Sequence, residues 1–131
     1  MSRRKLRENI FKLLFLREFN SEAEMPEQVA LFFNAIEKLE PADQQYMEDK
    51  YAQVGGHLSE IDELLNENAS GWNTNRMSKV DLAILRLAVY EVKFDEDIPE
   101  SAAINEAVEL AKRFGGEASA TFVNGILGVI A

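Results

Sequence analysis

The chain of 131 residues contains no cysteine, only three prolines, one histidine and one tryptophan. Without cysteine it can form no disulfide and offers no thiol for catalysis or zinc binding. His57 is the one histidine, and it has neither a cysteine nor a second histidine to join it in a zinc site. No nucleophile motif supports a catalytic triad around it. We therefore expect an exposed residue at a helix break, and no metal, cofactor or catalytic site.

Long hydrophobic runs and alternating strand patterns are also missing. No apolar stretch reaches the roughly 18 residues that a membrane-spanning helix needs. The basic N-terminus lacks the small-residue cleavage site of a signal peptide. No phosphate-binding loop, dinucleotide fingerprint or EF-hand loop is present. These absences argue against a membrane protein and against an enzyme, and they favour a cytoplasmic binding protein.

Positive charge is concentrated at one end of an acidic chain. Residues 1–17 contain six Lys or Arg and one acid, residues 18–131 contain eight and 22, and the formal net charge is −9. The acidic body repels nucleic acid at long range, whereas the basic end can bind it locally, because salt screens charges beyond about 10 Å. Composition alone leaves open whether this end is a nucleic-acid site or a solvated helix face.

Apolar residues recur at helical spacing along nearly the whole chain, which predicts an all-α protein of about seven helices. The first helix should bury one apolar stripe, made of Leu6, Ile10, Leu13 and Leu14. Between Val80 and Tyr90 only Asp81 and Arg86 are polar, so this helix belongs in the middle of a bundle. The expected boundaries are Ser2, Phe19–Ser21, Pro26, Pro41, Gly55-Gly56, Ser78, Pro99 and Gly115-Gly116.

Several stretches carry a family resemblance. The strings "VDLAILRLAVYEV", "IPESAAINEAVELAKRFG" and "FVNGILG" resemble the NusB family of transcription antitermination factors. The opening "RRKLRENIFKLLF" is similar to that family's arginine-rich first helix, and "GWNTNRMSKVD" to its segment before the fifth helix. The resemblance covers nearly the whole chain. The string "AINEAVELAKRFG" is specific, because its order of small, polar and apolar residues goes well beyond amphipathicity.

The resemblance implies a fold and a function. Family members consist of two small helical bundles packed together, which we expect at roughly residues 1–70 and 71–131 of a single domain 1–131. They have no catalytic activity. They bind the single-stranded boxA element of nascent transcripts together with NusE, a small-subunit ribosomal protein. The assembly helps RNA polymerase to read through terminators, notably in ribosomal RNA operons. Some relatives self-associate, so a homodimer is a further expectation.

The resemblance and the charge pattern point to one set of RNA-binding residues. Arg3 and Arg7 are four residues apart and share a helix face, guanidinium groups can fork onto phosphates, and bases stack on aromatic rings. Phe15 matches a position where many relatives carry an RNA-facing tyrosine, and Phe122 matches one near the RNA; either can equally be core. The proposed set is Arg3, Arg4, Lys5, Arg7, Phe15 and Phe122.

Partner contacts are less defined. The family binds NusE around its fourth and fifth helices, where Arg76 and Asp81 are the charged candidates, although both could simply cap the helix and pair locally. Asn105 and Asn124 could contact RNA or a partner, but a buried pair with satisfied hydrogen bonds is the favoured expectation. The second class of function is a helical protein-interaction or dimerisation module without specific RNA binding. A third, the RNA-binding appendage of a ribosomal RNA methyltransferase, is set aside because the chain ends at Ala131 without room for a catalytic domain.

Overall fold

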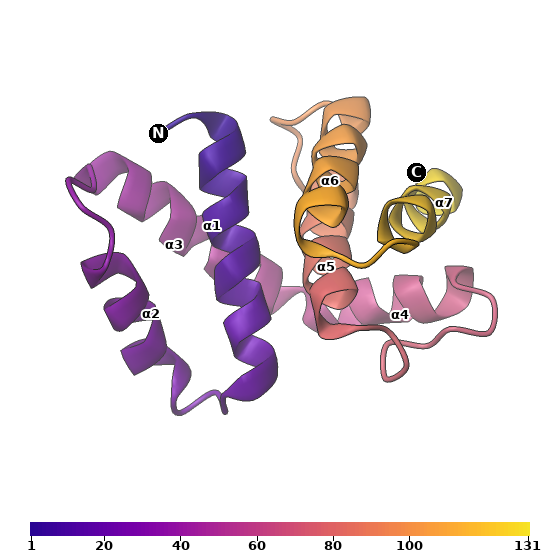
Figure 1. The fold of residues 1–131 in the computed structure, drawn as a ribbon, viewed down its shortest axis with the longest axis horizontal. Helices are drawn as coiled ribbons and strands as arrows, with labels where there is room; N and C mark the ends of the chain where they lie inside the picture. Colours follow the sequence, from indigo (N-terminus) through magenta and orange to yellow (C-terminus); the bar gives the residue numbers. More distant parts are fainter. The chain divides into compact units, whose positions relative to one another are not determined.

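A computed structural model describes all residues 1–131, and their regular structure is entirely helical (Figure 1). The prediction of an all-α protein with about seven helices is confirmed. No helix combines the length and the apolar character needed to cross a membrane. In chain order the elements are α1 (Arg3–Leu16), the short 3-10 helix η1 (Arg17–Phe19), α2 (Met25–Asn34), α3 (Pro41–Gly56), α4 (Leu58–Asn68), α5 (Lys79–Phe94), α6 (Glu100–Phe114) and α7 (Ser119–Ile130).

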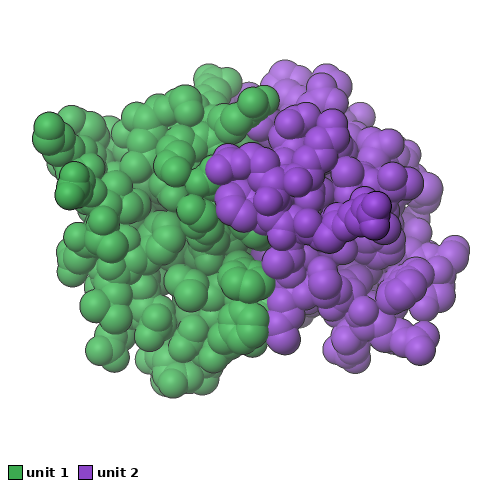
Figure 2. All heavy atoms as spheres, viewed as in Figure 1, with its two compact units in different colours: residues 1–55 green, residues 56–131 purple.

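The chain divides into two compact units, Met1–Gly55 and Gly56–Ala131, which Figure 2 shows in different colours. The first unit contains α1, η1, α2 and nearly all of α3, and the second contains α4 to α7. The division falls at the glycine pair, and not near residue 70 where the sequence led us to place it. The reason is that α4 packs on α5 and α7, so it belongs with the helices that follow it.

Helix α1 begins at the predicted cap, where Ser2 Oγ accepts a hydrogen bond from the Lys5 backbone N–H at 3.1 Å. Helical turns continue through η1 to Phe19, as the sequence indicated. All four residues of the predicted apolar stripe are buried, and α1 packs against α2. Burial also includes three neighbouring polar residues, namely Arg7, Glu8 and Asn9. The helix is therefore less exposed along its middle than a simple amphipathic stripe predicts.

A reciprocal pair of hydrogen bonds precedes α2. The Ser21 backbone N–H donates to Glu24 Oε1 at 2.7 Å, and the Glu24 backbone N–H donates to Ser21 Oγ at 3.3 Å, which is a capping box. Because the Glu24 carboxylate accepts the Ser21 backbone N–H, its pKa lies below the usual value. Pro26 follows in the first turn of the helix, where its missing N–H needs no partner, as predicted.

Helix α5 is the central helix of the second unit. It contacts α4, α6 and α7, and ten of its residues are buried, which confirms the predicted position in the middle of a bundle. Its Arg86 forks onto Asp62 of α4, with Nε 3.0 Å from Oδ1 and Nη2 2.8 Å from Oδ2. These two hydrogen bonds pair the Arg86 guanidinium, one of the few charged groups on α5, with a carboxylate of the neighbouring helix.

The turn from α6 to α7 depends on Gly115. A Cβ at Gly115 would lie 2.5 Å from Cβ and Oγ of Ser119 and 2.8 Å from the Ala111 carbonyl oxygen, so a larger residue cannot fit without a shift. The Gly116 backbone N–H donates to Ser119 Oγ at 2.9 Å. Together these contacts fix the first turn of α7, which carries Phe122. Near the end of α7, Ile130 is buried and Val129 is exposed.

The expectation of a buried pair formed by Asn105 and Asn124 is wrong, because both residues are exposed. On α6 the buried face carries Ala103, Ala107 and Leu110, and a residue two positions beyond Ala103 turns away from that face. Asn124 similarly follows the buried Val123 by one position. Neither amide therefore needs a partner inside the protein.

We predict that Ser78→Ala lowers the free energy of unfolding by about 1 kcal/mol, because Ser78 Oγ accepts the Asp81 backbone N–H at 3.1 Å and so caps α5. Urea unfolding followed by circular dichroism measures the change. Ser59→Ala, at an exposed position of α4 that caps no helix, is the matched control and should leave stability within about 0.5 kcal/mol. Equal stability of the two variants would contradict the capping role.

Candidate nucleic-acid and partner interface

The first turn of α1 presents a cluster of exposed cations, which are Arg3, Arg4 and Lys5. No acidic residue lies in this turn. Cations at a helix N-terminus oppose the helix dipole and cost about 0.3–1 kcal/mol each, so helix stability does not account for them. The positive end of the dipole adds to their field, and the combination attracts anions. The exposed part of the predicted basic edge is this cluster.

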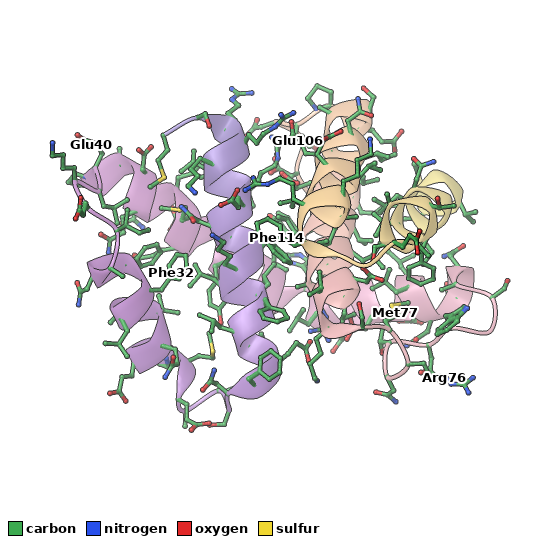
Figure 3. The ribbon with its side chains drawn as sticks, in the orientation of Figure 1. Phe32, Glu40, Arg76, Met77, Glu106 and Phe114 are labelled. Atoms are coloured by element: carbon green, nitrogen blue, oxygen red, sulfur yellow. The ribbon has the colours of Figure 1, made fainter.

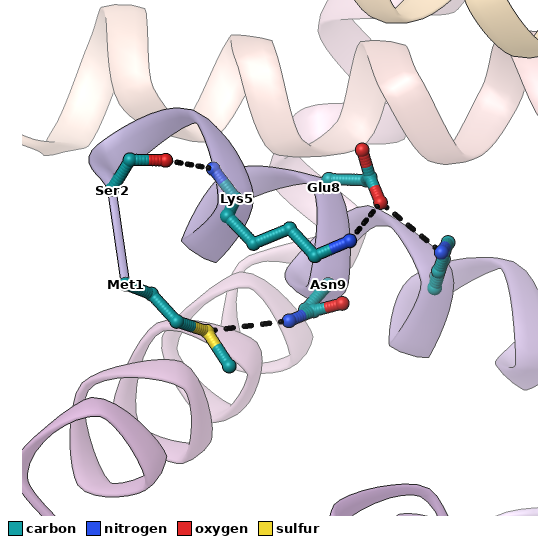
Figure 4. Close-up of polar contacts among 6 residues, drawn as sticks. Met1, Ser2, Lys5, Glu8 and Asn9 are labelled. Atoms are coloured by element: carbon teal, nitrogen blue, oxygen red, sulfur yellow. Dashed lines mark hydrogen bonds and ion pairs between the residues drawn. The ribbon is translucent and has the colours of Figure 1, made fainter. Parts of the chain in front are cut away.

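The chain end that carries these cations is fixed in place. The N-terminal ammonium of Met1 lies 2.8 Å from Asp43 Oδ2 on α3, so the end of the chain is tied to a second helix. Asn9 Nδ2 also lies 3.6 Å from Met1 Sδ (Figure 4). An ordered chain end limits the directions in which Arg3 and Arg4 can reach.

Arg7 differs from the rest of the predicted edge. Arg7 is only 8% exposed, and it already interacts with other groups of the protein. The expectation that it shares an accessible face with Arg3 is therefore not met. The reason is helical register: Arg7 precedes the buried Ile10 by three positions and shares its face.

Three phenylalanines follow one another at a spacing of four residues along α1 and η1. The Phe15 ring lies 6.3 Å from that of Phe11 and 5.0 Å from that of Phe19, edge to face with the latter at 70°. Phe11 is buried, Phe15 is half-buried, and Phe19 is 58% exposed. Phe15 thus belongs to both the core and the surface. Phe19 was missed from the sequence, although its spacing from Phe15 was a usable signal.

A pocket of about 340 Å³ lies in the second unit, between the loop before α5 and the start of α7. Its aromatic wall is formed by Trp72 and Phe122, whose rings meet nearly perpendicularly at 71° with centroids 6.1 Å apart. Trp72 is 53% exposed and Phe122 is half-buried. The lining residues are Trp72, Met77, Ser78, Asp81, Gly116, Ala118, Ser119 and Phe122.

Asp81 places a carboxylate in this pocket. The residue is 9% exposed, and its Oδ1 is buried without a hydrogen-bond partner. A buried carboxylate oxygen without a partner is energetically costly, so this atom is a ready acceptor for an N–H group that enters the pocket. Arg76 is exposed, and Figure 3 shows it directed outward from the loop between α4 and α5.

Two residues that the sequence assigned to different ligands therefore line one pocket. Phe122 was predicted to contact RNA and Asp81 to contact a partner protein, and both belong to this cavity. The sequence connects Trp72 with function only through the family resemblance. The one signal that could have identified it as a site residue was a lone tryptophan in a loop rich in Asn, Ser, Thr and Gly.

His57 is not the exposed residue that the sequence suggested. It is half-buried at the start of α4, with its ring 5.5 Å from that of Tyr90 and 4.4 Å from that of Phe94. The two aromatic residues come from α5, which packs on α4 and so covers the helix break. No group of three or more His, Asp or Glu side chains is arranged to hold a metal ion.

Comparison with known proteins identifies the family that this chain resembles. A model described as the NusB family matches residues 4–131. Two proteins called transcription antitermination protein NusB are similar over nearly their whole length. The protein from Lachnoclostridium phytofermentans is 48% identical over 97% of this chain and 96% of its own. The protein from Agathobacter rectalis is 50% identical over 97% of each.

Solved structures agree with this similarity. The structure of T. maritima NusB superposes with a TM-score of 0.88 at 37% identity, covering all of this chain and 91% of the other. A crystal structure of antitermination factors NusB and NusE in complex with double-stranded RNA gives a TM-score of 0.80 at 25% identity, covering 98% and 94%.

We predict that Arg7→Ala and Arg3→Ala have different effects on stability. Arg7→Ala should lower the free energy of unfolding by about 1–3 kcal/mol, because it removes a buried side chain together with its polar contact. Arg3→Ala, at an exposed position, should change it by less than about 0.5 kcal/mol. Urea denaturation of both variants measures the difference. Equal and small effects would show that Arg7 is not held in the protein interior.

Proposed function

The chain belongs to the NusB family, and on that basis we propose that it acts in transcription antitermination. It binds the single-stranded boxA element of nascent ribosomal RNA transcripts together with NusE in the cytoplasm. Bound in this way, it helps RNA polymerase to read through terminators. The related complex of NusB and NusE with double-stranded RNA supports the RNA and NusE parts of this proposal, since that NusB chain shares the fold over nearly the whole length.

The observation that carries the RNA-binding half of the proposal is the exposed cluster of Arg3, Arg4 and Lys5 in the first turn of α1. Phosphates accept charge-assisted hydrogen bonds from guanidinium groups, and the dipole at the same helix end adds to the attraction. Arg7 contributes less to phosphate contact, because its burial leaves little of the guanidinium accessible. The acidic remainder of the chain disfavours phosphate elsewhere.

Aromatic rings supply the second part of the proposed RNA site. Single-stranded bases stack on aromatic side chains at about 1–3 kcal/mol per base. Phe15 offers part of its ring beside the exposed Phe19, and Phe122 offers part of its ring beside the exposed Trp72. We place base stacking at the Phe15–Phe19 pair and at Phe122, and phosphate contact at the cation cluster.

The partner protein is proposed to bind at the pocket that contains Asp81. A guanidinium or ammonium group of NusE would donate to the unpartnered Oδ1 and lie against the Trp72 ring, an arrangement that aromatic rings favour for cations. The exposed Arg76 would pair with an acidic side chain of NusE at the edge of the same surface. The partner must therefore present a cation to the buried oxygen of Asp81 and an acidic side chain to the exposed Arg76.

The shared pocket also gives a reason for joint binding. Because Phe122 and Asp81 line one cavity, RNA and NusE would lie next to each other on the second unit. A ligand that fills this cavity and orders its aromatic wall lowers the cost of binding the other. We therefore expect NusE to raise the affinity for RNA, and linkage then requires RNA to raise the affinity for NusE by the same factor.

We predict that the double substitution Arg3→Ala, Arg4→Ala weakens binding of boxA RNA severalfold or more. It should also lower the slope of log affinity against log salt by about 0.7 for each phosphate that the variant no longer neutralises. Fluorescence anisotropy with labelled RNA at several salt concentrations measures both. The matched control is Lys93→Ala, Lys112→Ala, which removes the same charge from two exposed positions of α5 and α6 and should leave binding unchanged.

The same titration separates the proposed function from a protein-interaction module. Specific function requires tighter binding to single-stranded boxA RNA than to a scrambled single strand or to a duplex of the same sequence. Equal affinity for all three probes, or no binding to any, would contradict the proposal. Unchanged boxA affinity in the Arg3, Arg4 variant would contradict the placement of the site.

We predict that Asp81→Asn weakens NusE binding at least tenfold, because an amide cannot pair with a cation as a buried carboxylate does. Isothermal titration with purified NusE, with and without boxA RNA, measures the loss. Trp72, the only tryptophan, reports occupation of the pocket through its fluorescence. Asp97→Asn, at an exposed position beyond α5, is the control. NusE binding that survives Asp81→Asn undiminished would place the partner elsewhere.

A further inference from the structure

The basic helix α1 contains one acid, and this acid is buried. Glu8 Oε2 accepts a hydrogen bond from Lys5 Nζ at 2.8 Å and another from Lys12 Nζ at 3.1 Å (Figure 4). The Glu8 side chain is 4% exposed, whereas those of Lys5 and Lys12 are 52% and 40% exposed. Two half-exposed ammonium groups therefore converge on a single buried oxygen.

The convergence fixes the distance between the two ammonium groups. Their Nζ atoms cannot lie farther apart than the sum of their distances to Glu8 Oε2. Two lysine ammonium groups at such a separation repel each other, and a negative charge between them removes that repulsion. Both pairs follow the spacing that brings side chains together on a helix, three residues for Lys5 and four for Lys12.

The charges of this cluster also need an explanation. A buried carboxylate requires a counter-charge, and one ammonium group would supply it. Here two ammonium groups meet the same carboxylate oxygen, and both lysine side chains still reach water. A phosphodiester carries one negative charge and can be contacted by two ammonium groups that are held this close together.

We propose that Lys12 is a further RNA-binding residue. Lys5 and Lys12, which Glu8 holds close together, bind the same phosphate of the RNA. Glu8 is a positioning residue: it touches no RNA, and acts by holding the two ammonium groups side by side. This inference rests on the proposed RNA-binding function and deepens it. It assigns Lys12, which lies in the basic N-terminal segment but is absent from the set of RNA-binding residues predicted from the sequence.

The test is a set of salt titrations with the single-stranded boxA probe. Lys5→Ala and Lys12→Ala should each lower affinity severalfold, and each should lower the slope of log affinity against log salt by about 0.7, the value for one phosphate on a single strand. Because both lysines serve the same phosphate, the double variant should lose no more of the slope than either single variant. Lys112→Ala, which breaks a comparable Lys–Glu pair on α6 at 3.5 Å, is the control and should change nothing.

Glu8→Gln distinguishes positioning from a purely structural role. Glutamine keeps the size of the side chain and removes the charge that holds the two ammonium groups together. In this background the effects of Lys5→Ala and Lys12→Ala should become additive, so that the double variant loses about twice the slope of a single one. A residue that only supports the fold would alter stability without changing this additivity. Thermal unfolding confirms that each variant is folded.

Three results would overturn the inference. Lys12→Ala could bind boxA RNA with unchanged affinity and slope; the lysine effects could already be additive with Glu8 present; or they could stay non-additive in the Glu8→Gln background. If the Arg3, Arg4 variant still loses affinity in the same experiment, the RNA-binding function stands and only the lysine pair is refuted. Absence of boxA binding by the unmodified protein would instead refute the proposed function itself. Should Glu8→Gln fail to fold, the lysine variants decide the question alone.

Discussion

Helix α5 can be apolar on almost every side only because three other helices of its unit surround it. This enclosure determines what its few polar residues can do. Arg86 meets Asp62 of α4 in a two-bond pair and needs nothing further. Asp81, near the start of the same helix, leaves one carboxylate oxygen unpartnered at a pocket wall. The same burial thus produces a satisfied structural pair at one position and an open acceptor at another.

Helix α1 differs from α5, because it carries many charged residues and still packs an apolar stripe against the protein core. Its apolar stripe holds it against α2, and its first turn leaves Arg3 and Arg4 in water. Burial continues around Arg7 and Glu8, where charges persist only with partners. A helix that was packed for stability alone would replace these residues with apolar ones. Keeping them retains a positive surface whose side chains are held in fixed places.

Much of the fold could be predicted from the sequence, since helical periodicity and capping residues are local signals. Ser2, Ser78 and Pro26 occupy the helix starts that their chemistry favours. The division between units could not be placed correctly, because it depends on α4 packing against α5 and α7, contacts that no local pattern encodes. The burial of Arg7 escaped prediction for a related reason: charge dominated the interpretation of a position that lies on the packed face.

The candidate site shows the same limit in sharper form. Residue types along α1 indicated which side chains could meet phosphate, but not that Lys5 and Lys12 converge on one buried oxygen. Likewise, Trp72 and Phe122 are far apart in the chain, and only the tight turn at Gly115 and Gly116 brings the start of α7 to the loop before α5. Sequence spacing reveals neighbours on one helix, whereas a pocket between elements depends on how they pack. Both features depend on contacts formed in the folded protein, the lysine pair on the buried Glu8 and the aromatic pair on the packing of α7 beside the loop before α5.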